Sequence, residues 1–147
     1  MLFQYINRNP EICRGSPVIN GRRLTICNII LSCATSLESC KKDYELSLDT
    51  IKEAIIFCKD LHCFSQSDSS RTLNFCCNCI LRNYTEPDEF EVGVFYDNLN
   101  KANSLEHKNE LIHDYIGYRT WKIADLLFKH IFIENNHETN FNIAEID

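Results

Sequence analysis

The chain contains few of the residues that interrupt regular structure, with only four glycines and three prolines among 147 residues. It has no apolar run long enough to cross a bilayer as a helix. The segment from Met1 to Arg8 lacks the basic start and apolar block of a secretory leader. The apolar share of 44% and the charged share of 24% are ordinary for a soluble globular protein. We therefore expect a cytoplasmic protein.

The familiar sequence patterns of catalysis are also missing. The chain has no glycine-rich phosphate loop and no serine in a nucleophile elbow. His107, Glu110 and His113 follow one another at intervals of three residues. The zinc pattern of metalloproteases instead needs two histidines one helical turn apart, at a spacing of four. We therefore predict that the protein is not an enzyme.

Nine cysteines are present, and without a secretory leader they favour free thiols over a disulfide framework. Cys76 and Cys79, with Cys58 and Cys63, have the residue types of a tetrahedral zinc site. Against this, the spacing fits loosely, and Cys58 falls on the apolar face of a predicted helix. Free cysteine is commonly a buried core residue. The prediction is therefore no metal and no cofactor.

The few glycines and prolines are concentrated near the N-terminus. Within twelve positions the chain places Pro10, Gly15, Pro17 and Gly21. Because glycine permits a positive φ and proline fixes φ, this clustering predicts a turn of defined geometry. Residues 1–14 are predicted to form an extended arm or edge strand.

Three short helices are predicted after this turn. Apolar residues at helical spacing indicate helices over about 26–34 and 36–43, and a third that begins after Ser47. Thr35 and Glu38 have the spacing of a capping box for the second helix. Ser47 is the predicted N-cap of the third helix, which is apolar enough to form the centre of its lobe.

The same stretch carries a set of motif residues. The matching positions are Gly15, Pro17, Ile19, Gly21 and Arg23, followed by Ser36, Glu38, Asp43, Tyr44, Leu46, Ser47, Ile51 and Ala54. They resemble the signature G-x-P-x-I-x-G-T-R and later positions of the bacterial "domain of unknown function 433" family. The chain departs from that pattern at Arg22, where the family has threonine, and at Glu45, where it has proline. The resemblance covers about the first sixty residues, and it implies a helix-turn-helix fold and toxin–antitoxin company, with no catalytic residue.

A serine-rich linker over 64–75 is predicted to separate this part from a second lobe. The run FEVGVFY, residues 90–96, alternates in a way that predicts a strand. Helices are predicted over 104–116 and 118–133, with Gly117 ending the first of them. The fold class expected is therefore mainly α with minor β.

The polar tail that begins at Glu134 is expected to fray, with Phe141, Ile143 and Ile146 as candidate docking points. The predicted organisation is then a helix-turn-helix-like three-helix lobe over 1–64 and a small α+β lobe over 65–147.

The net charge of −6 is unevenly distributed between these lobes. Residues 1–64 hold eight basic and seven acidic side chains, whereas residues 65–147 hold seven basic and fourteen acidic ones. A solvated acidic surface is the simplest interpretation. The alternative is that the second lobe faces a basic partner.

The strongest acidic group also contains aromatic residues, a mixture that provides interface anchors. The predicted partner-binding residues are Glu86, Asp88, Glu89, Phe90, Glu91, Tyr96 and Asp97.

Two functions follow from these patterns. The favoured one is an antitoxin or immunity protein that binds a cognate basic toxin, such as a nuclease, and covers its active site. The alternative is a helix-turn-helix DNA-binding regulator, with Arg22 and Arg23, together with Arg14 and Arg8, contacting phosphates. Asp49 and Glu53 on the predicted third helix argue against base recognition by that helix.

Overall fold

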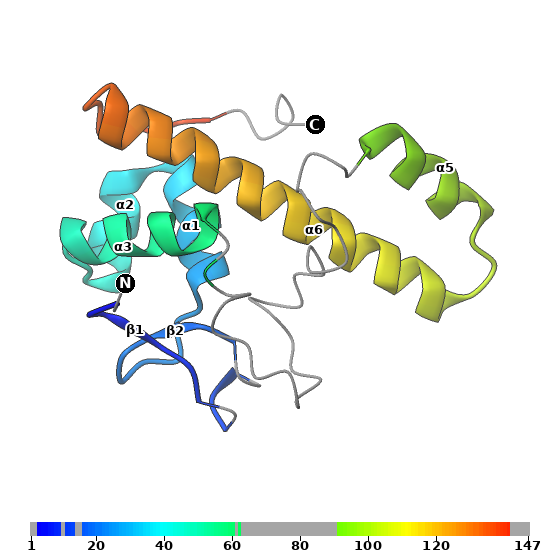
Figure 1. The fold of residues 1–147 in the computed structure, drawn as a ribbon, viewed down its shortest axis with the longest axis horizontal. Coiled ribbons are helices and arrows are strands. Elements are labelled where there is room, and N and C mark those ends of the chain that lie inside the picture. The colour runs from blue at the N-terminus through cyan, green and yellow to red at the C-terminus, as the bar shows by residue number, and fades with distance from the viewer. Residues whose placement is uncertain (1–2, 10, 14–15, 61, 63–90, 142–147) are drawn as a thin grey trace.

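The structure, a computed structural model, describes residues 3–9, 11–13, 16–60, 62 and 91–141. This part of the chain is mainly helical, with one small antiparallel sheet of two strands. The elements are β1 (Ile6–Asn7), β2 (Val18–Ile19), α1 (Ile26–Thr35), α2 (Leu37–Tyr44), α3 (Leu48–Lys59), α5 (Val92–Lys101), α6 (Leu105–Phe128) and the π-helical turn η4 (Lys129–Ile133) (Figure 1). The predicted fold class, mainly α with minor β, is therefore confirmed.

The N-terminal turn has the geometry that its glycine predicts. β1 pairs with β2 so that Ile6 faces Ile19. The Ile19 carbonyl then accepts a hydrogen bond of 3.0 Å from the Arg22 backbone N–H, which closes a four-residue turn. Gly21 occupies its third position with a φ of 73°, the value that favours glycine in a type II turn. Gly15, the other glycine of the motif, lies outside the described residues.

The N-terminal arm is held to α3 by a carboxylate. The two oxygens of Glu53 accept hydrogen bonds of 2.7 Å each from the backbone N–H groups of Gln4 and Tyr5. The Phe3 ring meets the Phe57 ring edge-on, with 4.9 Å between centroids. Residues 3–5 of the predicted arm are thus held against α3, which supplies both their acceptor and their apolar contact.

All three helices predicted after the turn are present. The third begins as expected, since the Ser47 hydroxyl accepts from the Thr50 backbone N–H at 3.2 Å. The capping box of the second helix was assigned one residue too early, because Thr35 is the last residue of α1. Ser36, with extended backbone, accepts instead from the Ser39 N–H at 3.2 Å. Its own N–H donates to the Ser32 carbonyl, so one residue both ends α1 and begins α2.

The two departures from the family motif meet at the end of α2. Glu45, where the family has proline, has a φ of 53°, which a proline ring excludes. Its backbone N–H donates to the Lys41 carbonyl. Arg22, where the family has threonine, donates from its guanidinium to the carbonyl of Tyr44, the last residue of α2. In this chain an arginine and a left-handed residue therefore satisfy the carbonyl end of α2.

The prediction that Gly117 ends a helix is wrong. α6 runs without interruption from Leu105 to Phe128, and Gly117 is buried inside it. Glycine within a helix costs about 1 kcal/mol relative to alanine. Packing on both sides of Gly117 outweighs that cost: α6 packs against α5 on one side and against α1 and α3 on the other. The indole of Trp121 also donates to the Lys59 carbonyl at 2.9 Å, which ties α6 to the end of α3.

The strand predicted over 90–96 is also wrong, because Val92–Lys101 is a helix. Phe95 and Leu99, one helical turn apart, are the α5 side chains that pack on the core. The alternation of apolar residues in this run fits a strand locally. In the helix the 1.5 Å rise per residue brings Phe95 and Leu99 about 6 Å apart along the axis, where both pack on the core beside α6.

One apolar core joins the described elements. Its fully buried members include Ile29 and Ile30 of α1, Phe57 of α3, and Ile123 and Leu127 of α6. Residues from both predicted lobes therefore contribute to the same cluster. The predicted lobe boundary, between 64 and 65, lies outside the described residues.

The described part of the polar tail, residues 134–141, is docked on the three-helix lobe. The Thr139 hydroxyl accepts a hydrogen bond of 2.6 Å from the Leu37 N–H and donates one of 2.7 Å to the Cys33 carbonyl. The Phe141 N–H donates to the Ala34 carbonyl at 2.9 Å, so the predicted docking of Phe141 is confirmed. Ile143 and Ile146 lie outside the described residues. The tail thus caps the corner between α1 and α2.

Replacing Thr139 by valine is expected to destabilise the protein by about 1–3 kcal/mol, because it leaves a buried N–H and a buried C=O without partners. Urea unfolding followed by circular dichroism measures the change. Thr139→Ser, which keeps the hydroxyl, is the matched control and should cost less. Equal losses for the two variants would contradict a hydrogen-bonding role for Thr139.

Candidate protein-interaction surface

A helical hairpin extends from one end of the molecule. α5 lies beside the N-terminal half of α6, away from α2 and α3 (Figure 1). The two helices are joined by residues 102–104, and α6 begins where the Ser104 hydroxyl accepts from the His107 backbone N–H at 3.1 Å. We call residues 91–116 the α5–α6 hairpin.

Aromatic packing holds the α5–α6 hairpin together. The rings of Phe95 and Tyr115 stack with 4.6 Å between centroids and an interplanar angle of 7°. Phe95 is only 5% exposed. The Tyr96 ring flanks this pair, with its centroid 6.2 Å from that of Tyr115. Because both helices contribute rings, their relative position is fixed by side-chain packing rather than by the short connection alone.

Three predicted partner-binding residues lie on this hairpin. Glu91 is the N-cap residue of α5, makes no side-chain capping bond and is exposed. Tyr96 is 47% exposed, and Asp97 is exposed. The helix spreads these residues around its circumference, so Tyr96 and Asp97 point about 100° apart instead of lying on opposite faces of a strand. The other four predicted residues, Glu86, Asp88, Glu89 and Phe90, lie outside the described residues.

Exposed apolar side chains are the feature that the sequence interpretation missed. Leu105 is 75% exposed, Ile112 38% and Ile116 37%, and Val94 on α5 is half-exposed. The apolar spacing of Leu105, Ile112 and Ile116 predicts a helix face, and such a face is ordinarily assigned to the core. Periodicity identifies the face but carries no information on whether another element covers it.

The α5–α6 hairpin is also acidic. Residues 91–116 contain five carboxylate side chains and two lysines, which gives a net charge of −3 with neutral histidines. Glu106 and Glu110 are exposed near the start of α6. Glu110 pairs with His107, with 3.8 Å between Nδ1 and the carboxylate. The combination of exposed apolar and acidic side chains is typical of a protein-binding surface.

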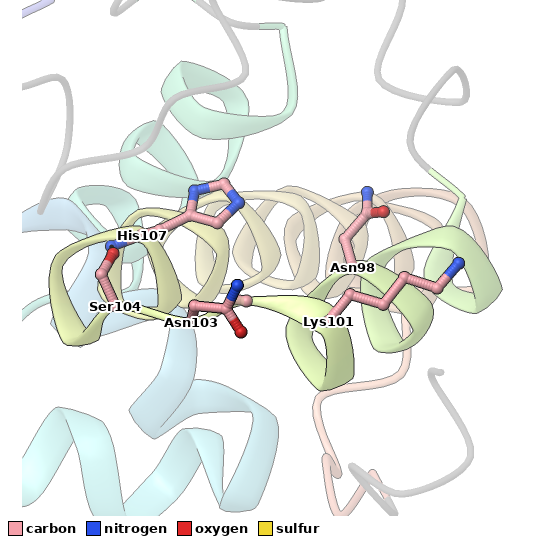
Figure 2. A pocket seen from close by; sticks show the side chains of 6 residues that line it. Asn98, Lys101, Asn103, Ser104 and His107 are labelled. Atoms are coloured by element: carbon pink, nitrogen blue, oxygen red, sulfur yellow. Dashed lines mark hydrogen bonds between the residues drawn. The ribbon is translucent and has the colours of Figure 1, made fainter.

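A polar hollow of about 390 Å³ lies at the turn of the hairpin. It is lined by Asn98, Lys101, Ala102, Asn103, Ser104 and His107. Figure 2 shows Asn98 and Lys101 on α5 and Ser104 and His107 at the start of α6, with Asn103 between the two helices. The Ser104 oxygen is engaged as the cap of α6, and the His107 ring is paired with Glu110. These groups can hydrogen-bond a small polar group, but the hollow does not pair a nucleophile with a base.

One of the arginines considered for phosphate binding has a partner within the protein. The Arg22 guanidinium is engaged by the Tyr44 carbonyl. Arg23 is exposed beside it, and Arg14 lies outside the described residues. Because one guanidinium N–H of Arg22 already binds a carbonyl at the end of α2, fewer N–H donors of this residue are available to bind a phosphate.

The polar residues of α3 are likewise engaged within the protein. The Lys52 ammonium lies 5.4 Å from the centroid of the Phe132 ring, and the Lys59 ammonium lies 4.4 Å from that of Phe128. Glu53 binds the N-terminal arm. A recognition helix presents such side chains to base edges in a groove. In this structure they face α6, η4 and the arm.

The described cysteines are free thiols: Cys13, Cys27, Cys33, Cys40 and Cys58. Within residues 3–62 and 91–141, apart from the short undescribed gaps, no three His, Cys, Asp or Glu side chains gather closely enough to hold a metal ion. The zinc alternative also needs Cys63, Cys76 and Cys79, which lie outside the described residues.

Two of the thiols interact with each other across the α1–α2 corner. Cys33 and Cys40 are both fully buried. Their hydrogen bond, together with burial, raises the pKa of the Cys33 thiol far above its usual range. The same bond lowers the pKa of Cys40. Cys33 is therefore a protonated thiol at neutral pH.

Within the described part of the chain, no helix combines the length and the apolar character needed to cross a bilayer. α6 has 24 residues, which is long enough, but charged side chains recur along it.

Comparison with known proteins gives one result. Residues 6–58 match the model of a family described as "Protein of unknown function (DUF433)", and the resemblance predicted from the motif is confirmed over that segment. The match spans β1 to α3 and ends before α5 and α6. No curated protein and no solved structure matches the chain.

Burial predicts a ranking of thiol reactivity. In a short pulse of iodoacetamide at pH 8, Cys13, which is partly exposed, is expected to be alkylated well before Cys33 and Cys40. Site-resolved mass spectrometry measures the three rates, and the same pulse in urea should remove the difference. Labelling of Cys33 at the rate of Cys13 in the folded protein would contradict the buried thiol pair.

Proposed function

We propose that this protein is a cytoplasmic antitoxin or immunity protein that binds a cognate toxin directly and covers its active site. The observation that supports the proposal most is the α5–α6 hairpin, which presents apolar side chains among carboxylates at one end of the molecule. The DUF433-like segment, residues 6–58, serves in this view as the scaffold on which α6 is mounted.

A nuclease is the class of toxin that fits this surface. Enzymes that cleave nucleic acids bind a phosphate backbone and therefore carry basic clefts. A hairpin with a net charge of −3 complements such a cleft, which accelerates association and disfavours wrong partners. The exposed apolar residues then supply the contacts that slow dissociation.

The alternative, a DNA-binding regulator, has weaker support. DNA recognition by α3 requires its polar side chains to be available, whereas Lys52, Glu53 and Lys59 have partners within the protein. The net charge of −6 also opposes approach to a phosphate backbone. A gel shift with DNA from the chain's own promoter at low salt tests this alternative, and tight binding there without any protein partner would favour it.

The antitoxin proposal predicts that a product of a gene flanking this one is toxic and is neutralised by this chain. Each flanking product is expressed alone and with the chain, and host growth is measured. We expect one product to arrest growth when alone and to co-elute with the chain from size-exclusion chromatography when both are purified. If neither flanking product is both toxic and bound, the proposal is wrong.

Charge reversal on the hairpin tests the electrostatic part. The double variant Glu91→Lys with Asp97→Lys is expected to slow association with that toxin about tenfold at low salt, because attraction is replaced by repulsion. The matched control is Glu134→Lys with Glu138→Lys, an equal change of charge at exposed positions on the other side of the molecule. Association rates come from stopped-flow fluorescence. Equal effects from the two double variants would place the interface elsewhere.

A further inference from the structure

One apolar stripe runs along most of α6, and only part of it is covered by the described elements. Leu105, Ile112, Ile116, Ile123 and Leu127 are separated by steps of seven and four residues, so they lie on one face of the helix. Ile123 and Leu127 are fully buried where α6 packs on α1 and α3. Toward the hairpin the exposed fraction rises to 37% at Ile116 and 75% at Leu105. The apolar face of α6 that packs in the core therefore continues toward the start of the helix, where it is exposed.

We propose that Leu105, Ile112 and Ile116, which we call the distal stripe, are the apolar anchor on which a basic protein partner docks. This rests on the proposed function and adds the face of the molecule that makes the contact. The distal stripe differs from the acidic residues predicted on α5, because it supplies apolar contacts rather than charge.

The distal stripe favours a partner because its three exposed apolar side chains share one face of the helix, with Ile112 and Ile116 one turn apart. The polar residues Lys108 and Asn109 separate Leu105 from this pair. Isolated exposed apolar residues are common on protein surfaces, whereas apolar residues grouped on one face mark an interaction site. Burial of such side chains contributes about 25 cal/mol per Å² of apolar surface removed from water. The hydrophobic effect that stabilises Ile123 and Leu127 in the core would thus also stabilise a contact in which a partner buries Ile112 and Ile116.

The net charge of the hairpin favours a basic partner. Glu106 and Glu110 are both exposed on the same helix and lie about 100–140° around it from the stripe, whereas Lys108 lies closer to the stripe. Within the hairpin, Lys101 and Lys108 oppose five carboxylates. The next cation along α6, Arg119, has its guanidinium 5.9 Å from the Tyr115 ring centroid. A basic surface therefore meets a net attraction from the hairpin as a whole.

The same charges disfavour a second copy of this chain. Two hairpins brought face to face would place a net charge of −3 against −3 across the contact. Like charges in close apposition cost several kcal/mol in general at an interface. Self-association through the distal stripe would leave that repulsion uncompensated, whereas a cationic partner removes it.

The distal stripe is also preorganised. It lies on one continuous helix whose other half is fixed in the core by Leu127 and by the Trp121 hydrogen bond to the Lys59 carbonyl. The stacked rings of Phe95 and Tyr115 brace its exposed half. A rigid surface loses little conformational entropy on binding, which favours tight association.

Site-specific photo-crosslinking in the cells that produce the protein tests the proposal. A photo-crosslinking amino acid replaces Leu105 in one full-length variant and Ile133 in a matched control. Ile133 is 68% exposed in η4, at the opposite end of the long helix. We expect a protein with excess Lys and Arg to be captured from position 105 and not from position 133. Capture of a second copy of this chain, or of nothing, overturns the proposal.

Affinity measurements with the purified captured protein complete the test. The double variant Ile112→Gln with Ile116→Gln should weaken binding at least a hundredfold, mainly through faster dissociation. Ile133→Gln should leave binding unchanged. Circular dichroism and thermal melting establish that both variants fold, and Ile112→Ser with Ile116→Ser serves as a second version if the first does not. Unchanged affinity in a folded distal-stripe variant overturns the proposal.

The outcomes separate this inference from the proposed function. If the captured basic protein is harmless when expressed alone, the interface stands and the antitoxin function falls. If a flanking toxin is neutralised equally well by the wild-type chain and the distal-stripe variant, the antitoxin function stands and the distal stripe is not its anchor.

Discussion

The packing of α6 across α1 and α3 is the contact on which the rest of the structure depends. Ile123 and Leu127 fill the space beside Phe57, and the Trp121 indole satisfies a carbonyl at the end of α3. This contact buries the apolar side of the three-helix lobe and determines the direction in which the hairpin projects. It also brings the Phe128 ring 4.4 Å from the Lys59 ammonium, measured to the ring centroid.

The parts of the fold that could be predicted from the sequence are those decided within a few residues. Ser47 and the helix after it follow from side-chain capping and local apolar spacing, as does the positive φ of Gly21. Residues 92–101 and Gly117 were misassigned because their local patterns allow two structures, and contacts with α6 decide between them. The docking of Thr139 depends on backbone groups more than a hundred positions away, which no local pattern encodes.

The candidate site, like the fold, could be predicted from the sequence only in part. Acidic residues on the surface could be predicted, because charge is visible in the sequence and is rarely buried. Glu91, Tyr96 and Asp97 are indeed exposed. The exposure of Ile112 and Ile116 could not be predicted, since an apolar helix face looks the same whether it lies in a core or at an interface. Burial depends on how far the covering lobe extends, which is a property of tertiary structure.

The two hydrogen bonds that Thr139 makes to α1 and α2 have a consequence for the resistance of the chain to proteolysis. Its hydroxyl joins the first N–H of α2 to a carbonyl near the end of α1, and the adjacent backbone binds the Ala34 carbonyl. A backbone cut between η4 and this threonine would release both helices from these contacts in one step. The resistance of α1 and α2 to opening therefore depends on an intact connection through α6 and η4.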